Sequence, residues 1–255
     1  MRSRRNWPGL ALTLVIGTAT LWLAATGQLV LYIHPRYVVF TVVMTLCGMG
    51  LALVALARSG DSDEQDEHAA ADGGGAGAAD LPRSRRPSPV ALGAALVVTL
   101  VAVALVVLPP AVLSSATAST RGLGAAVTTT GSVRTDGATT KYTVLDWASK
   151  LRASTDIGSY ENESVDVTGF VSPSPDDPDD TFYVTRFVIT CCAVDAQPVG
   201  VPVYAPAWKD SLEANQWVRI QGAFATNPSA ASSATIALVP RAVSKIDQPH
   251  DPYLY

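Results

Sequence analysis

The sequence predicts a membrane protein with three N-terminal transmembrane helices and a C-terminal all-β domain outside the membrane. Three long stretches without any charged side chain occur in the first half of the chain, and each has roughly the length of a membrane-spanning helix. From about residue 163 the apolar residues recur at every second position, which is typical of β-strands. The arginines cluster on one side of the apolar stretches, and this bias orients the helices.

The apolar stretches define a membrane domain of residues 1–108, with spans at about residues 8–31, 38–57 and 90–108. A helix needs about 20 apolar residues to cross the hydrocarbon core of a bilayer, and the second and third stretches fit this length. The first stretch is longer, so it can tilt or leave its end at the interface. A cleaved signal peptide is the alternative for the first stretch, and buried helices of a soluble protein are the alternative for all three.

Basic residues predict the orientation of the spans, because lysine and arginine favour the cytoplasmic side. Arginines precede the first span and lie between the second and third, whereas the loop between the first two spans holds only Arg36. We therefore expect a cytoplasmic N-terminus, a cytoplasmic segment 58–89 and an extracytoplasmic chain after Leu108. The cytoplasmic arginines are Arg2, Arg4, Arg5, Arg58, Arg83, Arg85 and Arg86.

Two segments lack the apolar residues that a folded core requires. Residues 58–89 are acidic, then rich in Gly and Ala, then basic, and they predict a disordered cytoplasmic linker. His68 lies among the acids there and belongs to a solvated charge run, with weak metal binding as the alternative. Residues 109–140 are small and polar and predict an extracytoplasmic tether.

The predicted β domain occupies residues 141–255 and begins with a short amphipathic helix. Five strands follow, with a two-turn helix between the third and fourth. This element order is that of an OB-like five-stranded barrel, although a small β-sandwich would give a similar pattern. Gly169 and Gly222 lie where the strands of such a barrel coil sharply. The strands are ESVDVTGFV, TFYVTRFVITC, VGVPVYAP, QWVRIQGAF and TIALVPRAVSKI.

Composition and motifs point to a non-catalytic protein. The formal net charge of −4 gives no sign of nucleic-acid binding. The sequence contains no phosphate-binding loop, dinucleotide fingerprint, serine-hydrolase elbow or zinc-protease helix. The spans carry no Asp, Glu, Lys or Arg, which ion pathways need, so they suit an anchor or a subunit packed on a larger membrane partner. Gly48, Gly50 and Ala52 give the second span a small-residue face for such packing.

The adjacent cysteines Cys191 and Cys192, followed by Asp195, form the most distinctive candidate site. Adjacent residues of a strand point to opposite faces, so the pair cannot share an ion if the strand continues through it. If the strand ends at Cys191, both thiols and the carboxylate could face one loop and hold zinc or copper. A structural role, a metal site and a redox pair all stay open. A catalytic cysteine is disfavoured, because the only histidine after the third span is His250.

Two further candidates near the membrane have simpler interpretations. The outer loop reads YIHPRY at residues 32–37, and its tyrosines and Arg36 are typical of a membrane interface. His34 could instead bind a cation or sense pH. Cys47 lies in the middle of the second span, where we expect a packing residue.

Three blocks of the sequence resemble the YcgQ-like family of uncharacterised bacterial membrane proteins, which are described as permease subunits. The blocks read GQLVLYIHPRY, PPAVLSSATASTRG and RFVITCCAVDAQPVGVPVY, the last followed by QWVRIQG. The family pattern is close to R-F-x-x-x-C-C-A-A-D-A with P-G-V downstream, and Val194 stands here where alanine is usual. The motif residues are Arg186, Phe187, Cys191, Cys192, Asp195 and Gly200.

The resemblance implies a subunit that works beside a multi-spanning permease in the bacterial cell membrane. It assigns no catalytic residue, and gene context suggests a metal ion as the substrate. We therefore expect an accessory, non-catalytic subunit in the lipid bilayer whose outer β domain scaffolds, gates or samples the substrate. The alternatives are a self-sufficient ligand-binding module anchored in the envelope, and a soft-metal capture or redox protein that uses the cysteine pair.

Overall fold

A computed structural model of the chain divides into two compact units. The first unit comprises Met1–Val30 and Pro35–Pro110, and the second comprises Leu31–His34 and Ala111–Tyr255. A short segment between the first two helices therefore belongs to the second unit. The structure describes residues 7–69, 112–123, 139–160 and 163–255, together with Gly93, Leu96, Val97 and Leu100.

The first unit is built on two apolar helices, α1 (Trp7–Ala25) and α2 (Val38–Ala69). α1 ends earlier than the expected span because Gly27 turns the chain with a φ of 72°, a left-handed conformation that glycine adopts at little cost. A 3-10 turn (Gln28–Leu31) follows. α2 continues beyond residue 57 into the expected linker, where Glu, Gln and Ala favour helix, and the rest of that linker lies outside the described residues.

Within the described residues, one helix is long and apolar enough to cross a membrane. It covers Pro35–Ala55 and has a mean hydropathy of 2.4, whereas Gly9–Ala25 is apolar but shorter. An apolar helix this near the N-terminus could be a membrane anchor or a signal sequence. The expected third span, 90–108, lies outside the described residues except for four helical positions.

α1 and α2 pack closely at Gly17, where an added Cβ would lie 2.6 Å from the sulfur of Met49. The contact uses a glycine of α1. Of the small-residue face expected on α2, Ala52 is buried, whereas a Cβ at Gly48 or Gly50 would meet nothing within 4 Å. Threonine hydroxyls in both helices donate to the carbonyl oxygen four residues earlier, as Thr18 does to Leu14 over 2.8 Å. Such bonds satisfy hydroxyl groups in apolar surroundings.

The second unit is built on a six-stranded sheet of mostly antiparallel strands. Its order is β1-β4-β5-β3-β2-β6, with a further pairing between β1 and β2, so the first five strands pair in a ring. β3 and β5 close the ring as parallel strands through Val203 and Leu238. The strands are β1 (Val165–Pro173), β2 (Thr181–Val188), β3 (Gln197–Tyr204), β4 (Trp217–Thr226), β5 (Ile236–Lys245) and β6 (Tyr253–Leu254).

The sheet contains the five expected strands with three differences. β6 is an additional strand and pairs in parallel with β2. β2 ends at Val188 instead of reaching Cys191. The expected two-turn helix before β4 is a single 3-10 turn, Trp208–Asp210.

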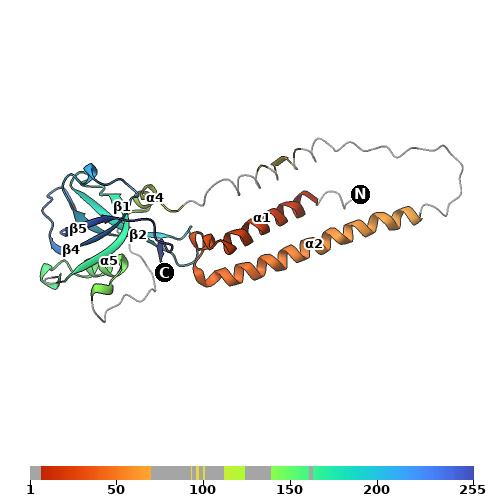
Figure 1. Ribbon diagram of the computed structural model, residues 1–255, viewed down its shortest axis with the longest axis horizontal. Coiled ribbons are helices and arrows are strands. Elements are labelled where there is room, and N and C mark those ends of the chain that lie inside the picture. The colour runs from red at the N-terminus through yellow and green to blue at the C-terminus, as the bar shows by residue number, and fades with distance from the viewer. Residues whose placement is uncertain are drawn as a thin grey trace. The chain divides into compact units, whose positions relative to one another are not determined.

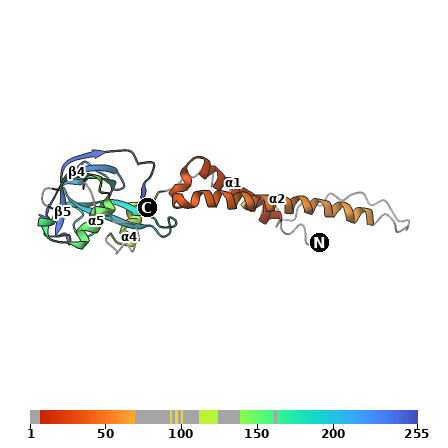
Figure 2. The same cartoon turned by 90° about the horizontal axis from the view of Figure 1, so that it is seen from below.

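Helix α5 (Val144–Ala153) covers part of the main core (Figures 1 and 2). A capping box starts it, in which Thr143 and Asp146 bind each other's backbone N–H groups. The Trp147 side chain is fully buried, and its ring meets Phe224 of β4 edge-on with centroids 5.1 Å apart. The helix therefore seals an aromatic end of the core.

Gly169 and Gly222 allow neighbouring strands to approach closely. A Cβ at Gly169 would lie 2.5 Å from the carbonyl oxygen of Thr185 in β2. A Cβ at Gly222 would collide with the carbonyl oxygen of Val239 in β5, next to a register shift between β4 and β5. Larger residues at these positions would push the paired strands apart, as expected for tightly coiled strands.

The described residues 112–123 of the expected tether belong to the β unit. They contain helix α4 (Ser115–Arg121), whose Ala118 is fully buried in a second core cluster with Phe170, Phe187, Ile189, Ala196 and Tyr253. The backbone N–H of Ser115 donates to the Asn215 side chain over 2.6 Å. The small and polar composition of this segment predicted a tether, but residues 112–123 pack against the β unit. Alanine makes this possible, because it fits at a buried position where a larger side chain would not.

Candidate functional site

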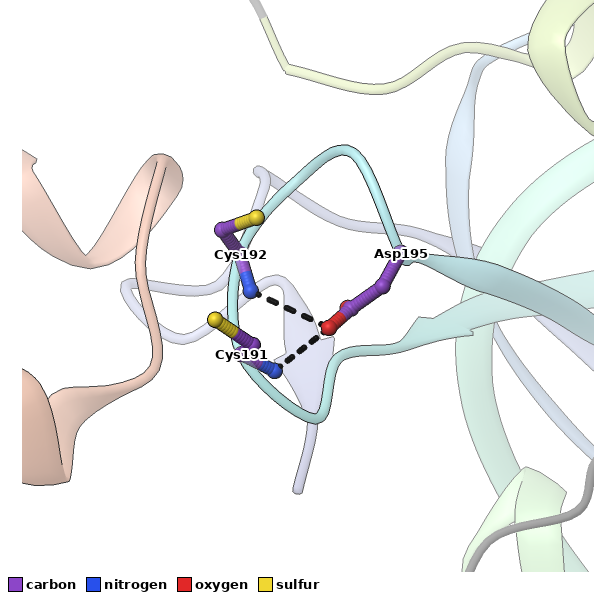
Figure 3. Close-up of side chains that lie close together, drawn as sticks. All are labelled: Cys191, Cys192 and Asp195. Carbon is purple, nitrogen blue, oxygen red and sulfur yellow. Dashed lines mark hydrogen bonds between the residues drawn. The ribbon is translucent and has the colours of Figure 1, made fainter.

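The candidate site lies on the loop of residues 189–196 between β2 and β3, which we call the cysteine loop. The backbone N–H of Ile189 donates to the carbonyl of Leu254 over 2.9 Å, after which the chain leaves β2. Cys191 and Cys192 thus lie on a loop rather than on opposite faces of a strand (Figure 3). Of the two arrangements open from the sequence, the structure has the one that can bring both thiols together.

The Asp195 carboxylate closes the cysteine loop on itself. Its Oδ2 accepts hydrogen bonds from the backbone N–H groups of Cys191, over 2.7 Å, and Cys192, over 3.4 Å (Figure 3). Its Oδ1 accepts from the backbone N–H of Thr190 over 3.2 Å. In return, the N–H of Asp195 donates to the Cys192 carbonyl over 3.0 Å. Asp195 therefore satisfies backbone groups that no strand partner reaches.

The three predicted site residues come together on this loop. The thiol sulfurs of Cys191 and Cys192 and a carboxylate oxygen of Asp195 all lie within 4.8 Å of one another. Cys191 is exposed and Cys192 is half-buried. Two sulfur donors and one oxygen donor thus share one accessible point on the surface.

The segment between α1 and α2 pairs with the cysteine loop. The N–H of Ala193 donates to the Tyr32 carbonyl over 2.8 Å, and the N–H of His34 donates to the Cys191 carbonyl over 3.0 Å. Ile33 and Cys192 form an antiparallel bridge between these bonds. The His34 ring meets the ring of Tyr255 edge-on at 4.7 Å, so residues 31–34 of the expected interfacial turn belong to the β unit.

Arg121 of α4 holds the far end of the cysteine loop. Its guanidinium Nη1 donates to the carbonyl oxygen of Ala196, and more weakly to that of Ala193 over 3.5 Å. The sequence did not single out Arg121 as a site residue. The one indication in the sequence was that Arg121 lies in one of the three blocks that resemble the family. Residues from all three blocks meet at this loop.

Arg186 fixes the C-terminal tail. Its guanidinium donates to the carbonyl oxygens of Asp251, over 2.6 Å, and Pro252, over 2.9 Å. It also lies over the Trp217 ring, 5.2 Å from the centroid. Burial lowers the pKa of Arg186 to about 10, so the group still carries its charge at neutral pH.

The other motif residues also have packing roles. Phe187 is buried and stacks on Phe170, with ring centroids 5.7 Å apart. A Cβ at Gly200 would lie 3.1 Å from the ring of Tyr183, so the glycine leaves room for that ring. Arg186, Phe187 and Gly200 therefore support the fold around the loop, whereas Cys191, Cys192 and Asp195 bring together the loop's thiols and carboxylate, of which Cys191 is exposed and the other two are half-buried.

Two hollows on the β unit lie away from the cysteine loop. The larger, of about 300 Å³, is lined by Lys141, Arg186 and the ion pair between Arg219 and Asp166. The smaller, of about 190 Å³, lies between α5 and β5. Neither is lined by a residue of the loop.

These features define a class of protein in which an apolar helix pair precedes a β unit that carries an exposed cysteine loop. Residues 10–124 match the DUF1980 N-terminal domain, and residues 139–255 match the DUF1980 C-terminal domain. The chain belongs to the DUF1980 family. No curated protein and no solved structure matches it. The segment that docks as α4 falls within the N-terminal match, so the family boundary and the structural boundary differ.

Proposed function

We propose that this protein is a membrane-anchored, non-catalytic accessory subunit of a multi-spanning permease in the bacterial cell membrane. The observation that carries the proposal is that Leu31–His34, between the two apolar helices, is part of the β unit. The β unit is thereby tied to the anchor at two separate points of the chain. A domain held in this way suits scaffolding, gating or sampling of a substrate at a partner's entrance.

The same observation supports three crossings of the membrane. If α1 and α2 both cross, Ala69 and the 31–34 segment lie on opposite sides. The β unit lies on the side of residues 31–34, because it contains them. The chain must then cross once more before residue 112, and the apolar stretch 90–108 has the required length. The arginine distribution favours a β unit outside and an N-terminus in the cytoplasm.

The strand pairings support an OB-like barrel for the β unit. In the OB fold, five strands form a partly open Greek-key barrel. Here β1 pairs with both β2 and β4, and β5 pairs with both β4 and β3, which completes a ring of five. Such a barrel leaves few open strand edges, so the pairing of residues 31–34 with a loop rather than an edge is consistent with it.

The helices themselves support an anchor that needs a partner. Their apolar segments carry no charged side chain, and the threonine hydroxyls are satisfied within the helices. A transport path through a membrane needs polar or ionisable groups facing a cavity. We therefore assign the transport path to the partner permease and the outer domain's role to this chain.

Co-purification tests the partnership. The tagged full chain is extracted from its native membrane in mild detergent, and the proteins that remain bound are identified by mass spectrometry. We expect a multi-spanning permease in about equal amount. Recovery of the chain without any such protein would contradict the proposal.

Site-specific crosslinking tests which surface faces the partner. Val194 is an apolar residue at the tip of the cysteine loop and is 83% exposed. Val243 on β5 is 38% exposed and serves as a matched control. A photoreactive amino acid at position 194 should capture the permease, whereas one at position 243 should not. Equal capture from both positions would argue against a role for the loop at the entrance.

A further inference from the structure

We propose that Cys191, Cys192 and Asp195 form a binding site for a zinc ion. The site goes beyond the accessory role, and it would exist whether or not a permease is the partner. The sequence alone could not decide between a shared loop and opposite faces of a strand. The loop geometry removes the objection to a shared ion.

The donor atoms have nearly the separation that zinc requires. Zinc binds thiolate sulfur at about 2.3 Å and carboxylate oxygen at about 2.0–2.2 Å in tetrahedral geometry, which places neighbouring donors roughly 3.5–3.8 Å apart. The three donors lie within 4.8 Å of one another, so changes in side-chain torsion can bring them to bonding distance. Three protein donors leave a fourth position for water or another ligand.

Asp195 retains the capacity to bind a metal. A carboxylate has about four acceptor positions. Oδ2 uses two of them for the N–H groups of Cys191 and Cys192, and Oδ1 uses one for the N–H of Thr190. One position on Oδ1 is left for an ion, while the hydrogen bonds hold the carboxylate in place.

The loop's backbone structure does not explain why cysteine occupies positions 191 and 192. All hydrogen bonds from these residues to Asp195 come from backbone N–H groups, which alanine or serine would supply equally. The exposed Cys191 side chain also buries little surface in the core. Alanine or serine would keep these backbone bonds but would supply no thiolate for a metal ion.

The surroundings hold the loop in a fixed conformation before any ion binds. Arg121 binds the Ala196 carbonyl, and residues 31–34 pair with Cys191 and Ala193 through their backbones. A site fixed by outer contacts loses less conformational entropy when it takes up an ion. The mixed sulfur and oxygen donors favour zinc, because copper in its monovalent state prefers sulfur ligands alone.

Zinc titration of the purified, reduced full chain in detergent tests the site. We expect one zinc ion per chain, measured against a competing chromogenic chelator. Cys191→Ser and Cys192→Ser should each weaken binding at least tenfold, and Asp195→Asn should weaken it by a smaller factor. Cys47→Ser is the matched control and should bind as the wild type does.

Phenylarsine oxide gives a second measurement on the wild-type chain, which needs no variant to fold. The reagent forms two bonds from arsenic to a pair of thiol sulfurs and releases water, so it should abolish zinc uptake. Lack of zinc uptake by the untreated chain, or equal loss in Cys47→Ser and Cys191→Ser, would overturn the site. Neither of these two results would change the outcome of co-purification with a permease. The zinc site and the permease partnership are therefore tested independently.

Discussion

The Arg186 side chain connects β2 to the C-terminal tail through carbonyl groups rather than through a carboxylate. A half-buried guanidinium costs desolvation energy, and here four backbone carbonyls and an aromatic face offset that cost. The carbonyls belong to Thr168, Asp251, Pro252 and Tyr253. This places the tail so that Leu254 can accept the hydrogen bond from Ile189, at the first residue of the cysteine loop.

Replacing Arg186 with methionine should destabilise the β unit by about 2–3 kcal/mol, because several carbonyls lose a charged donor. The midpoint of urea unfolding, followed by tryptophan fluorescence of the full chain in detergent, measures the effect. Arg219→Met is the control, because the ion pair of Arg219 with Asp166 lies at the surface and should leave the midpoint nearly unchanged. A larger effect at position 219 than at position 186 would contradict this account.

Asp177 makes the stability of the β unit depend on pH. Its carboxylate accepts hydrogen bonds from the hydroxyls of Ser229, over 2.6 Å, and Thr181, over 2.9 Å. These bonds hold the pKa of Asp177 below its ordinary value. Since the folded-state pKa is lowered, the stabilisation is complete above the unfolded-state pKa of about 4 and is lost as pH falls through the folded-state value.

We therefore expect the urea midpoint of the wild type to fall as the pH drops below about 4. Asp177→Asn should be less stable at pH 7 and should show a shallower decline in acid. Asp179→Asn removes an exposed carboxylate that pairs with Lys209 and should keep the wild-type pH profile. Identical pH profiles for Asp177→Asn and the wild type would refute the assignment.

At the scale of elements, α4 packs against the second core cluster, which includes Ile189 and Ala196 at the two ends of the cysteine loop. Ala118 faces Phe170 and Phe187 in the second core cluster, whereas Ala116, on the same helix, is exposed. Only a small side chain fits at position 118, because that position has no exposed surface. A charge placed there cannot be solvated while α4 remains docked.

Ala118→Glu should release α4 and expose the bond after Arg121 to trypsin. We expect cleavage at Arg121 to become at least tenfold faster than in the wild type, because proteolysis follows the population of the open form. Ala116→Glu adds the same charge on the exposed face and should be cleaved at the wild-type rate. Mass spectrometry of the fragments identifies the cleavage site, and equal rates for the two variants would show that α4 is not docked.

The strands could be predicted from the sequence, because alternating residues such as Val165, Val167 and Val171 record which face is buried. The end of β2 could not, because it depends on the tail at Leu254 and on the Asp195 carboxylate, which lie outside the strand itself. Sequence reasoning brought Cys191, Cys192 and Asp195 forward as a candidate site. Sequence reasoning could not predict the role of Arg121. Arg121 binds the loop from helix α4, and the composition of that segment predicted a tether instead of a helix.

The pairing of Ile33 with Cys192 had no signal in local sequence patterns either. Periodicity and turn residues report on neighbours along the chain, whereas this bridge joins segments separated by most of the protein. The resemblance to the family includes the block with Ile33 and the block with Cys192, but it does not indicate that the two blocks are in contact. The contact nevertheless makes residues 31–34 part of the β unit.

For the whole molecule, the shared unit of residues 31–34 and the β domain predicts that both lie on one side of the membrane. Segment 58–89 should lie on the other side. A cysteine introduced at Tyr32 or Glu213, in a chain whose natural cysteines are all serine, should react with a membrane-impermeant maleimide on intact cells. Both side chains are exposed.

A cysteine at Ala78 should react only after the cells are permeabilised, because the arginines near it favour the cytoplasm. Reaction of all three positions on intact cells would mean that neither α2 nor the stretch 90–108 carries the chain across the membrane. Reaction of Ala78→Cys alone on intact cells would invert the orientation while keeping residues 31–34 and the β unit on one side. The labelling pattern therefore separates the number of crossings from their direction, and the first follows from the Ile33–Cys192 bridge while the second follows from the arginines.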